Sequence, residues 1–269
     1  MPSLNLSKTV DEARKEAGSN LILNLSKNGL TRKAATSRVI LVLDVSGSTE
    51  DLYNDRYMQL ITTMVAGAAM NLDDDQQLDM VAFDSDLYTL PTLNASNAET
   101  YVDRYIFDSK RHSFRIGGHA TRYAKPLKHL MSFKPGDPVF CPFITDGENQ
   151  DQAEALAALI ALSYHGPVFV QTVGVGYGLR VAFDNLKEMN SMGVVSPDKG
   201  EEKGPRLIDN AGFCTVDFKH ATDQQVYDAL LNEYPSFLAK ATAKGYLPWT
   251  KSPLASQPGT GLGGIFGRR

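Results

Sequence analysis

The sequence predicts an α/β fold: a doubly wound, mainly parallel Rossmann-like sheet with helices on both faces and one antiparallel edge strand. First, from Val39 onward, short apolar runs alternate with longer helical patterns, the order typical of parallel sheets. Second, residues 39–43 are all apolar, as in a strand buried on both faces. Third, the apolar-rich runs 78–83 and 87–90 are so close that an antiparallel hairpin must join them.

The elements in the first half of the chain follow from periodicity. The first strand is predicted over residues 39–44, and apolar residues at helical spacing predict a helix over 55–71. Pro91 is expected to end the edge strand, because proline has no amide hydrogen for a neighbouring strand. Helices are also predicted over residues 97–108 and 121–132.

The second half continues the alternation of strands and helices. Residues 139–144 form an apolar run that contains Pro142, but the run ends in the polar residues Thr145, Asp146 and Gly147, like the first strand, and is therefore predicted to be a strand. The remaining predicted elements are a helix over 153–163, a strand over 167–173, a helix over 181–190, a strand region over 208–218 and a closing helix over 222–243.

The chain of 269 residues, 42% of them hydrophobic, can form one large domain with appendages. We predict an N-terminal strand or hairpin extension over residues 1–37, a main domain over 38–246 and a flexible tail over 247–269. The extension is predicted because Leu-Asn-Leu-Ser-Lys occurs twice, at 4–8 and at 23–27, and alternates apolar with polar residues, although coincidence explains the repeat equally well. The tail is rich in Gly, Pro and Ser.

Composition argues against several classes of partner. The formal charge is -4 and no block of Lys or Arg stands out, so nucleic acid is not expected as a partner. No segment is long and apolar enough to cross a membrane, and no secretory signal begins the chain. Cys141 and Cys214 are far apart and lack Cys-x-x-Cys spacing, which favours buried thiols over a zinc site or disulfide. A soluble, cytoplasmic protein without a membrane partner is expected.

Polar side chains follow two of the predicted strands. Asp44, Ser46 and Ser48 come after the first, and Asp146 follows the strand over 139–144. Because the carboxyl ends of parallel strands meet at one edge of a sheet, these oxygens are expected to converge, together with Thr121 from a glycine-containing loop. The predicted metal ligands are Asp44, Ser46, Ser48, Thr121 and Asp146. Oxygen ligands of this kind favour Mg²⁺, with Mn²⁺ and Ca²⁺ as alternatives.

The charges of these predicted ligands indicate how a bound metal would be used. Two carboxylates and three neutral hydroxyls neutralise a divalent cation only in part, because the hydroxyls carry no charge. An Asp or Glu from a protein partner can then supply a further ligand. We therefore expect recognition of a protein partner through the metal.

The motifs Asp44-x-Ser46-x-Ser48, Gly-Gly-x-x-Thr121 and Thr145-Asp146-Gly147 resemble the metal-ion-dependent adhesion site of von Willebrand factor A (VWA) domains, and the resemblance covers roughly residues 38–243. The segment 70–83 and the leucine-containing leader are most similar to the TerF-like branch, which is associated with tellurium and toxic-cation resistance in bacteria and phages. The resemblance implies a doubly wound fold with the metal site at one end and protein binding as the activity.

An enzyme is not expected. A phosphatase with an aspartate nucleophile needs a second carboxylate two residues after Asp44, where Ser46 stands, and neither a P-loop nor a Gly-x-Ser-x-Gly motif occurs. The function predicted is a metal-dependent protein-binding module, acting as a scaffold in a bacterial or phage tellurium or stress-response assembly. The alternatives are a metal-dependent phosphoesterase and a structural subunit whose metal site is non-functional.

Overall fold

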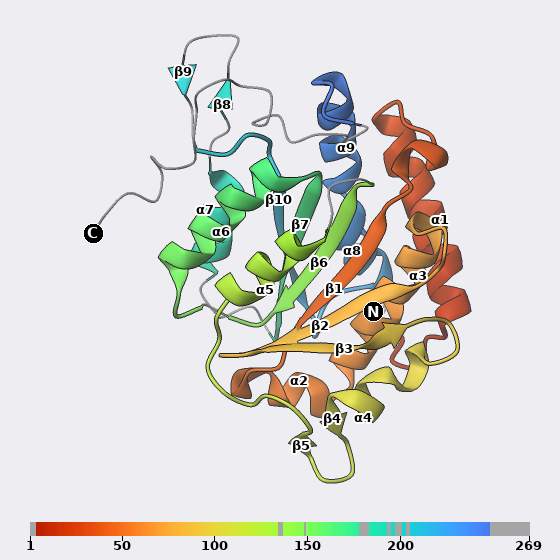
Figure 1. Ribbon diagram of the computed structural model, residues 1–269. Helices are drawn as coiled ribbons and strands as arrows, with labels where there is room; N and C mark the ends of the chain where they lie inside the picture. The colour runs from red at the N-terminus through yellow and green to blue at the C-terminus, as the bar shows by residue number, and fades with distance from the viewer. Residues whose placement is uncertain are drawn as a thin grey trace.

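A computed structural model describes residues 4–133, 137–147, 149–177, 183–192, 195–196, 201–202 and 205–247 (Figure 1). Its main feature is a six-stranded sheet in the order β10-β7-β6-β1-β2-β3. All neighbouring strands are parallel except β2 and β3, which form the antiparallel edge. The strands are β1 (Arg38–Asp44), β2 (Leu78–Phe83), β3 (Leu87–Leu93), β6 (Val139–Thr145), β7 (Val168–Gly176) and β10 (Ala211–Asp217). This topology confirms the predicted fold class.

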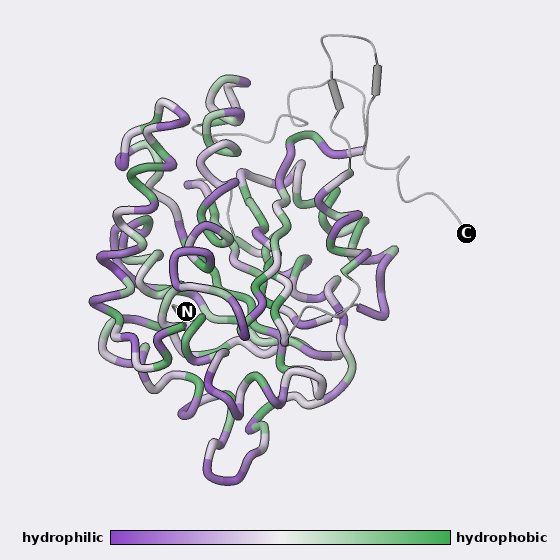
Figure 2. Tube along the Cα trace, turned by 180° about the vertical axis from the view of Figure 1, so that it is seen from behind, coloured by the Kyte–Doolittle hydropathy of each residue, from purple (hydrophilic) through white to green (hydrophobic). Residues whose placement is uncertain are grey.

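Helices cover both faces of the sheet, and a separate hydrophobic core lies between the sheet and the helices on each face. One core contains residues of α1 (Val10–Lys27), α3 (Tyr57–Leu72), α8 (Asp223–Leu231) and α9 (Tyr234–Ala243), and the other contains residues of α5 (Ala124–His129), α6 (Gln152–His165) and α7 (Asp184–Ser191). Successive residues of β1 point to opposite cores, since Leu41 lies in the first and Val42 in the second. Figure 2 shows the hydrophobic colour concentrated in the interior strands.

Short elements gather at the end of the sheet where β1, β2 and β6 finish (Figure 1). They include α2 (Glu50–Asn54), α4 (Tyr101–Tyr105) and the hairpin formed by β4 (Phe107–Asp108) and β5 (Ser113–Phe114). A second small hairpin joins β8 (Val195–Ser196) to β9 (Glu201–Glu202), and single 3-10 turns occur at η1 (Arg32–Ala35), η2 (Gly47–Thr49), η3 (Ala98–Thr100) and η4 (Leu130–Ser132).

Several predicted boundaries differ from the observed ones. The predicted helix over 55–71 begins only at Tyr57, after Arg56 in a left-handed conformation (φ 66°) that separates α3 from α2. The predicted helix over 97–108 ends early, and the closing helix is divided into α8 and α9 just before Pro235. Strand β3 continues through Pro91, which is tolerated because β3 is an edge strand with an irregular register there.

The predicted strand or hairpin over residues 1–37 is wrong, because the described part of this segment, residues 4–37, contains helix α1 and no strand. The helix begins with a capping box, in which the Thr9 side chain accepts from the Glu12 amide and Glu12 accepts from the Thr9 amide. The apolar side chains of its inward face have helical spacing and are those of Val10, Ala13, Ala17, Leu21 and Leu25. The second copy of the repeated sequence is simply the last turns of α1, with Leu23 exposed.

Helix α1 belongs to the body of the domain. The Tyr227 hydroxyl of α8 donates to the Ala13 carbonyl (3.1 Å), and the buried Lys8 ammonium lies 2.8 Å from the Asp223 carboxylate. The predicted division between residues 1–37 and the main domain therefore does not correspond to a structural boundary. Residues 248–269, which make up nearly all of the predicted tail, lie outside the described residues. Among the described helices, none is both long and apolar enough to cross a membrane.

Candidate metal site

Asp44, the last residue of β1, lies at the centre of the candidate site. Its side chain has no exposed surface. One carboxylate oxygen, Oδ1, accepts from the Ser46 amide (2.8 Å) and the other, Oδ2, accepts from the Thr145 hydroxyl (2.6 Å). The Asp44 carbonyl accepts from the Tyr53 hydroxyl of α2 (2.8 Å). Three hydrogen bonds thus hold the end of β1. Each carboxylate oxygen of Asp44 still has a lone pair that can interact with a further partner.

Ser46, Ser48 and Asp146 form a continuous row of oxygens beside Asp44. The two serine Oγ atoms are 3.2 Å apart, and Ser48 Oγ donates to Asp146 Oδ1 over 3.0 Å. The turn η2 begins immediately after Ser46 and is closed by Thr49, whose hydroxyl donates to the Ser46 carbonyl (2.7 Å). Four of the five predicted ligands, from the ends of two neighbouring parallel strands, therefore lie together.

The fifth predicted ligand, Thr121, belongs to a loop that is held against the ends of β1 and β6 through its backbone. The Gly118 amide donates to the Val45 carbonyl (2.7 Å), and the Thr121 carbonyl accepts from the Gln150 amide (3.0 Å). Gly117 has a φ of 83°, and a Cβ there would lie 2.5 Å from Val45 Cγ2, so the close approach depends on glycine. Within the described part of the chain, the Thr121 hydroxyl makes no hydrogen bond to the other four predicted ligands.

The electrostatics of the site follow from burial. Burial, together with the charge of Asp146, raises the pKa of Asp44 to about 7, and burial also raises the pKa of Asp146. Burial raises the pKa of the adjacent Tyr53 and Tyr123 hydroxyls as well. Two carboxylates close together in a low-dielectric environment repel each other, and a cation between them would relieve that repulsion.

The donor set fits a hard divalent cation. All five candidate donors are oxygens, which suits Mg²⁺, Mn²⁺ or Ca²⁺. No group of three or more His, Cys, Asp or Glu side chains with metal-binding geometry occurs among the described residues, so a carboxylate-rich or zinc-type centre is not seen in that part of the chain. The ligand role of Asp44, Ser46, Ser48, Thr121 and Asp146 stays a prediction that the geometry of four of them accommodates.

Asp84 also lies in the region of the candidate site, although the sequence analysis gave it no role. It follows β2 and has no exposed surface. Its Oδ2 accepts from the His119 amide (3.1 Å), its Oδ1 accepts from the Asp86 amide (2.7 Å), and its carbonyl accepts from the Arg122 amide (3.0 Å). Asp84 therefore holds the loop on both sides of Thr121. Its position could have identified it from the sequence, because Asp84 follows a buried strand just as Asp44 does.

A second set of supporting residues surrounds the end of β6. The Tyr123 hydroxyl lies 3.0 Å from Thr145 Oγ1 and also donates to the Gly147 carbonyl. The Asp151 carboxylate accepts from the Tyr123 and Ala124 amides (2.9 and 2.8 Å) and so fixes the start of α5. Nothing in the local sequence pattern identifies these partners, since each contact joins separate loops.

The doubly wound sheet and the oxygen-lined edge at its carboxyl end are the architecture of a VWA-type domain. Residues 36–247 match the vWA-TerF-like family, described as the vWA found in the TerF C terminus, and the chain belongs to this family. The family is related to tellurium resistance proteins. The match confirms the predicted family and its TerF-like branch.

Individual relatives were also found. The chain is 31% identical to the uncharacterized protein YcbR of Bacillus subtilis (strain 168) over 237 residues, which is 87% of this chain and 89% of YcbR. Among solved structures, two of proximal thread matrix protein 1 from the mussel byssus match with TM-scores of 0.48 and 0.47 at 14% and 15% identity. These matches cover 74% and 73% of this chain, which spans about half (48%) of the mussel protein.

Proposed function

We propose that this protein is a metal-dependent protein-binding module whose metal receives an acidic side chain from a partner. The observation that carries the proposal is the row of oxygens formed by Ser46, Ser48 and Asp146 beside the buried Asp44. Ser48 is exposed whereas Asp44 is not, so the row leads from the interior of the sheet edge to the surface. A ligand that arrives from outside would therefore meet the exposed end of the row.

Each residue has a defined part in this proposal. Ser46, Ser48, Thr121 and Asp146 would hold the cation, and Asp44 would bind it directly or through ordered water from beneath. The bound cation supplies a positive centre that attracts a carboxylate. Mg²⁺ is the cation proposed, with Mn²⁺ and Ca²⁺ as alternatives. Hydroxyl ligands leave the cation only partly neutralised, which favours capture of an Asp or Glu from another protein.

Recognition without catalysis is the activity proposed. Asp44 is fully buried with both carboxylate oxygens hydrogen-bonded, and so is poorly placed to attack a substrate as a nucleophile. The family relation to tellurium resistance proteins supports a role as a scaffold in a stress-response assembly. Cys141 and Cys214 are free thiols, consistent with the cytoplasmic setting proposed.

The first experiment tests the metal and the partner separately. Titration of Mg²⁺ into the purified protein, followed by isothermal calorimetry, is expected to reveal one binding site that Asp44→Asn abolishes. A pull-down from a lysate of the native host is expected to retain its partner in Mg²⁺, lose it in EDTA and regain it when Mg²⁺ is restored.

The matched control is Glu154→Gln, which also removes one carboxylate but on the exposed surface of α6. It is expected to behave as the wild type in both assays. A wild-type protein that binds none of the three cations would contradict the metal site. Partner binding that persists in EDTA and in Asp44→Asn would contradict recognition through the metal.

A further inference from the structure

A second surface of interest lies at the opposite end of the sheet from the candidate metal site. Three adjoining hollows of about 280, 420 and 490 Å³ begin there and continue along α1. The first and second share Thr36, Asp73 and Asp74, and the second and third share Arg14, Arg32 and Asn71. We call this continuous depression the trough. It begins at Arg38, the first residue of β1, whereas Asp44 of the metal site is the last.

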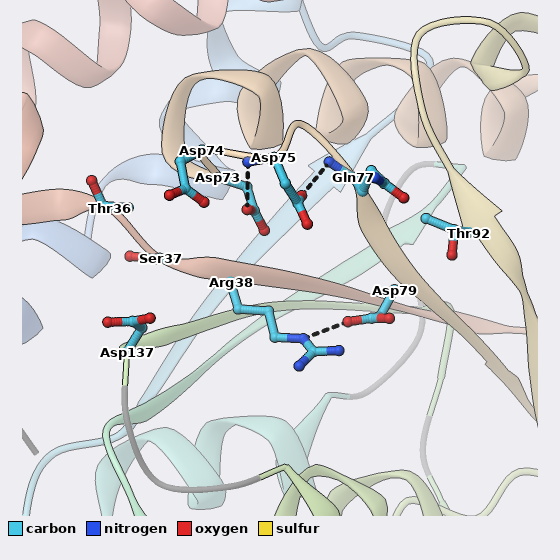
Figure 3. A pocket seen from close by; sticks show the side chains of 10 residues that line it. All are labelled: Thr36, Ser37, Arg38, Asp73, Asp74, Asp75, Gln77, Asp79, Thr92 and Asp137. Carbon is cyan, nitrogen blue, oxygen red and sulfur yellow. Dashed lines mark hydrogen bonds and ion pairs between the residues drawn. The ribbon is translucent and has the colours of Figure 1, made fainter. Parts of the chain in front are cut away.

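One half of the trough is acidic (Figure 3). Its lining contains five aspartates and one cation, Arg38, whose Nε lies 2.5 Å from the Asp79 carboxylate. The five aspartates are Asp73, Asp74, Asp75, Asp79 and Asp137. Asp74 and Asp137 are exposed and have no ion-pair partner among the described residues. This half therefore presents uncompensated negative charge to solvent.

The other half of the trough is basic. Its cations are Arg14 and Lys15 from α1, and Arg32 and Lys33 from η1, all of them exposed. In the described part of the chain, none of these cations lies within ion-pair distance of a carboxylate. The negative charges that line the same two hollows are Asp73 and Asp74, which also line the acidic half, and Asp11 at the far end. Arg32 is oriented by hydrogen bonds to the Asn71 side chain (2.7 Å) and carbonyl (3.2 Å).

An apolar side chain accompanies the basic half. Ile22 lines the third hollow and is 55% exposed, which makes it one of the most exposed large hydrophobic residues among those described. Burial of this side chain would contribute favourable free energy to an interface, in proportion to the apolar area removed from water. The trough thus combines opposite charges with an exposed aliphatic group.

We propose that the trough is the contact surface for a second copy of this chain. A surface with adjoining acidic and basic halves is self-complementary about a twofold axis, because rotation of one copy places its acidic half over the basic half of the other. Each dimer then contains the charge contact twice. The surface lies at the other end of β1 from Asp44, so the proposal does not depend on the metal.

The test is sedimentation equilibrium of the full chain in low and high salt. At about 0.05 M NaCl a concentration-dependent dimer is expected, and about 1 M NaCl should dissociate it because exposed charges are then screened. Two charge reversals are designed from side chains without hydrogen bonds among the described residues. Lys15→Glu with Lys33→Glu reverses the basic half, and Asp74→Lys with Asp137→Lys reverses part of the acidic half.

Each double variant alone is expected to raise the dimer dissociation constant more than about 10-fold, because the charge attraction between the two halves is then lost or reversed at both contacts. An equimolar mixture of the two is expected to restore the dimer, since a mixed pair regains opposite charges at both contacts. The control Lys128→Glu with Lys187→Glu changes the net charge by the same amount as the basic-half variant, but on α5 and α7, and is expected to leave the dimer unchanged.

Three results would overturn the proposal. The first is a wild-type chain that remains monomeric in low salt. The second is dimerisation of both double variants with wild-type affinity. The third is a mixture of the two folded double variants that stays monomeric. Circular dichroism of each variant establishes that it is folded before it is measured.

Discussion

Asp84 illustrates how a residue that need not touch a ligand can set the geometry of a binding site. Its carboxylate is fully buried and accepts hydrogen bonds from a backbone amide of the loop that carries Thr121, from an amide of its own turn and from the Tyr88 hydroxyl. A buried carboxylate is stabilised by several such donors, and the donors in turn lose their partner if the carboxylate is removed. The position of Thr121 relative to Ser46 and Ser48 is therefore coupled to Asp84.

We predict that Asp84→Ala weakens Mg²⁺ binding by about 10- to 100-fold, as is usual when a group that orients a metal ligand is lost. The free energy of unfolding should also fall by about 2 kcal/mol or more, because buried amides are left without an acceptor. Isothermal calorimetry and urea denaturation measure the two effects. Asp84→Asn retains an acceptor oxygen and is expected to recover part of the Mg²⁺ affinity.

Asp86→Asn provides the comparison for Asp84. The Asp86 carboxylate is 64% exposed and contacts Lys125 in a surface ion pair (2.6 Å), which contributes little to stability. This variant should match the wild type within about 0.5 kcal/mol. If Asp84→Ala were folded and bound Mg²⁺ as tightly as the wild type, the positioning role would be refuted.

The residues of the candidate site differ in how far the sequence could identify them. Asp44, Ser46, Ser48 and Asp146 directly follow buried strands, so the parallel sheet alone predicts that they meet. Asp84 satisfies the same rule and could have been included. The partners of Thr145 could not be predicted from the sequence, because the contact from Tyr123 depends on the path of a loop that local periodicity does not encode.

At the scale of elements, the packing of α1 against α3 explains why the N-terminal segment is part of the domain. Gly67 of α3 lies so close to α1 that a Cβ there would be 2.5 Å from the Ala13 carbonyl carbon. Small residues at such a crossing allow the two helix backbones to approach closely. The crossing fixes α1 over α3, whose residues are nearly all buried.

We predict that Gly67→Ala lowers the free energy of unfolding by about 1–3 kcal/mol, although alanine favours helices, because the added methyl group meets backbone that cannot move aside. Urea denaturation followed by circular dichroism measures the change. Gly176→Ala is the control, since no atom lies within 4 Å of a Cβ built at that position. It should differ from the wild type by less than about 1 kcal/mol. Equal stability of Gly67→Ala and wild type would contradict a tight crossing.

The same crossing explains why the strand or hairpin predicted over residues 1–37 is wrong. A two-residue alternation over five positions is too short to distinguish a strand from the last turns of a helix. The deciding contacts, such as those from α1 to Gly67 and to Tyr227, lie far along the sequence. The central strands were predictable because they are buried on both faces and their apolar runs have no competing pattern.

At the scale of the whole molecule, electrostatic repulsion within the candidate site is unfavourable for stability at the end of an otherwise well-packed sheet. Asp44 and Asp146 are two carboxylates in a mostly buried position, and burial raises the pKa of both. Sites that bind charged ligands commonly sacrifice stability in the absence of the ligand, because their groups are arranged for the ligand and not for each other. Cation binding should then return stability to the whole domain, since a ligand that binds only the folded state shifts the unfolding equilibrium.

We predict that saturating Mg²⁺ raises the thermal unfolding midpoint of the wild type, by roughly 5 °C or more at about 100 times the dissociation constant, and that EDTA reverses the shift. Asp44→Asn should be insensitive to Mg²⁺. Without metal it should unfold at or above the wild-type temperature, because the substitution removes one of two repelling buried carboxylates while retaining an acceptor oxygen. Differential scanning calorimetry measures both effects, with Glu154→Gln as the control that keeps the Mg²⁺ response. A Mg²⁺-dependent stabilisation of Asp44→Asn equal to that of the wild type would show that the cation binds elsewhere.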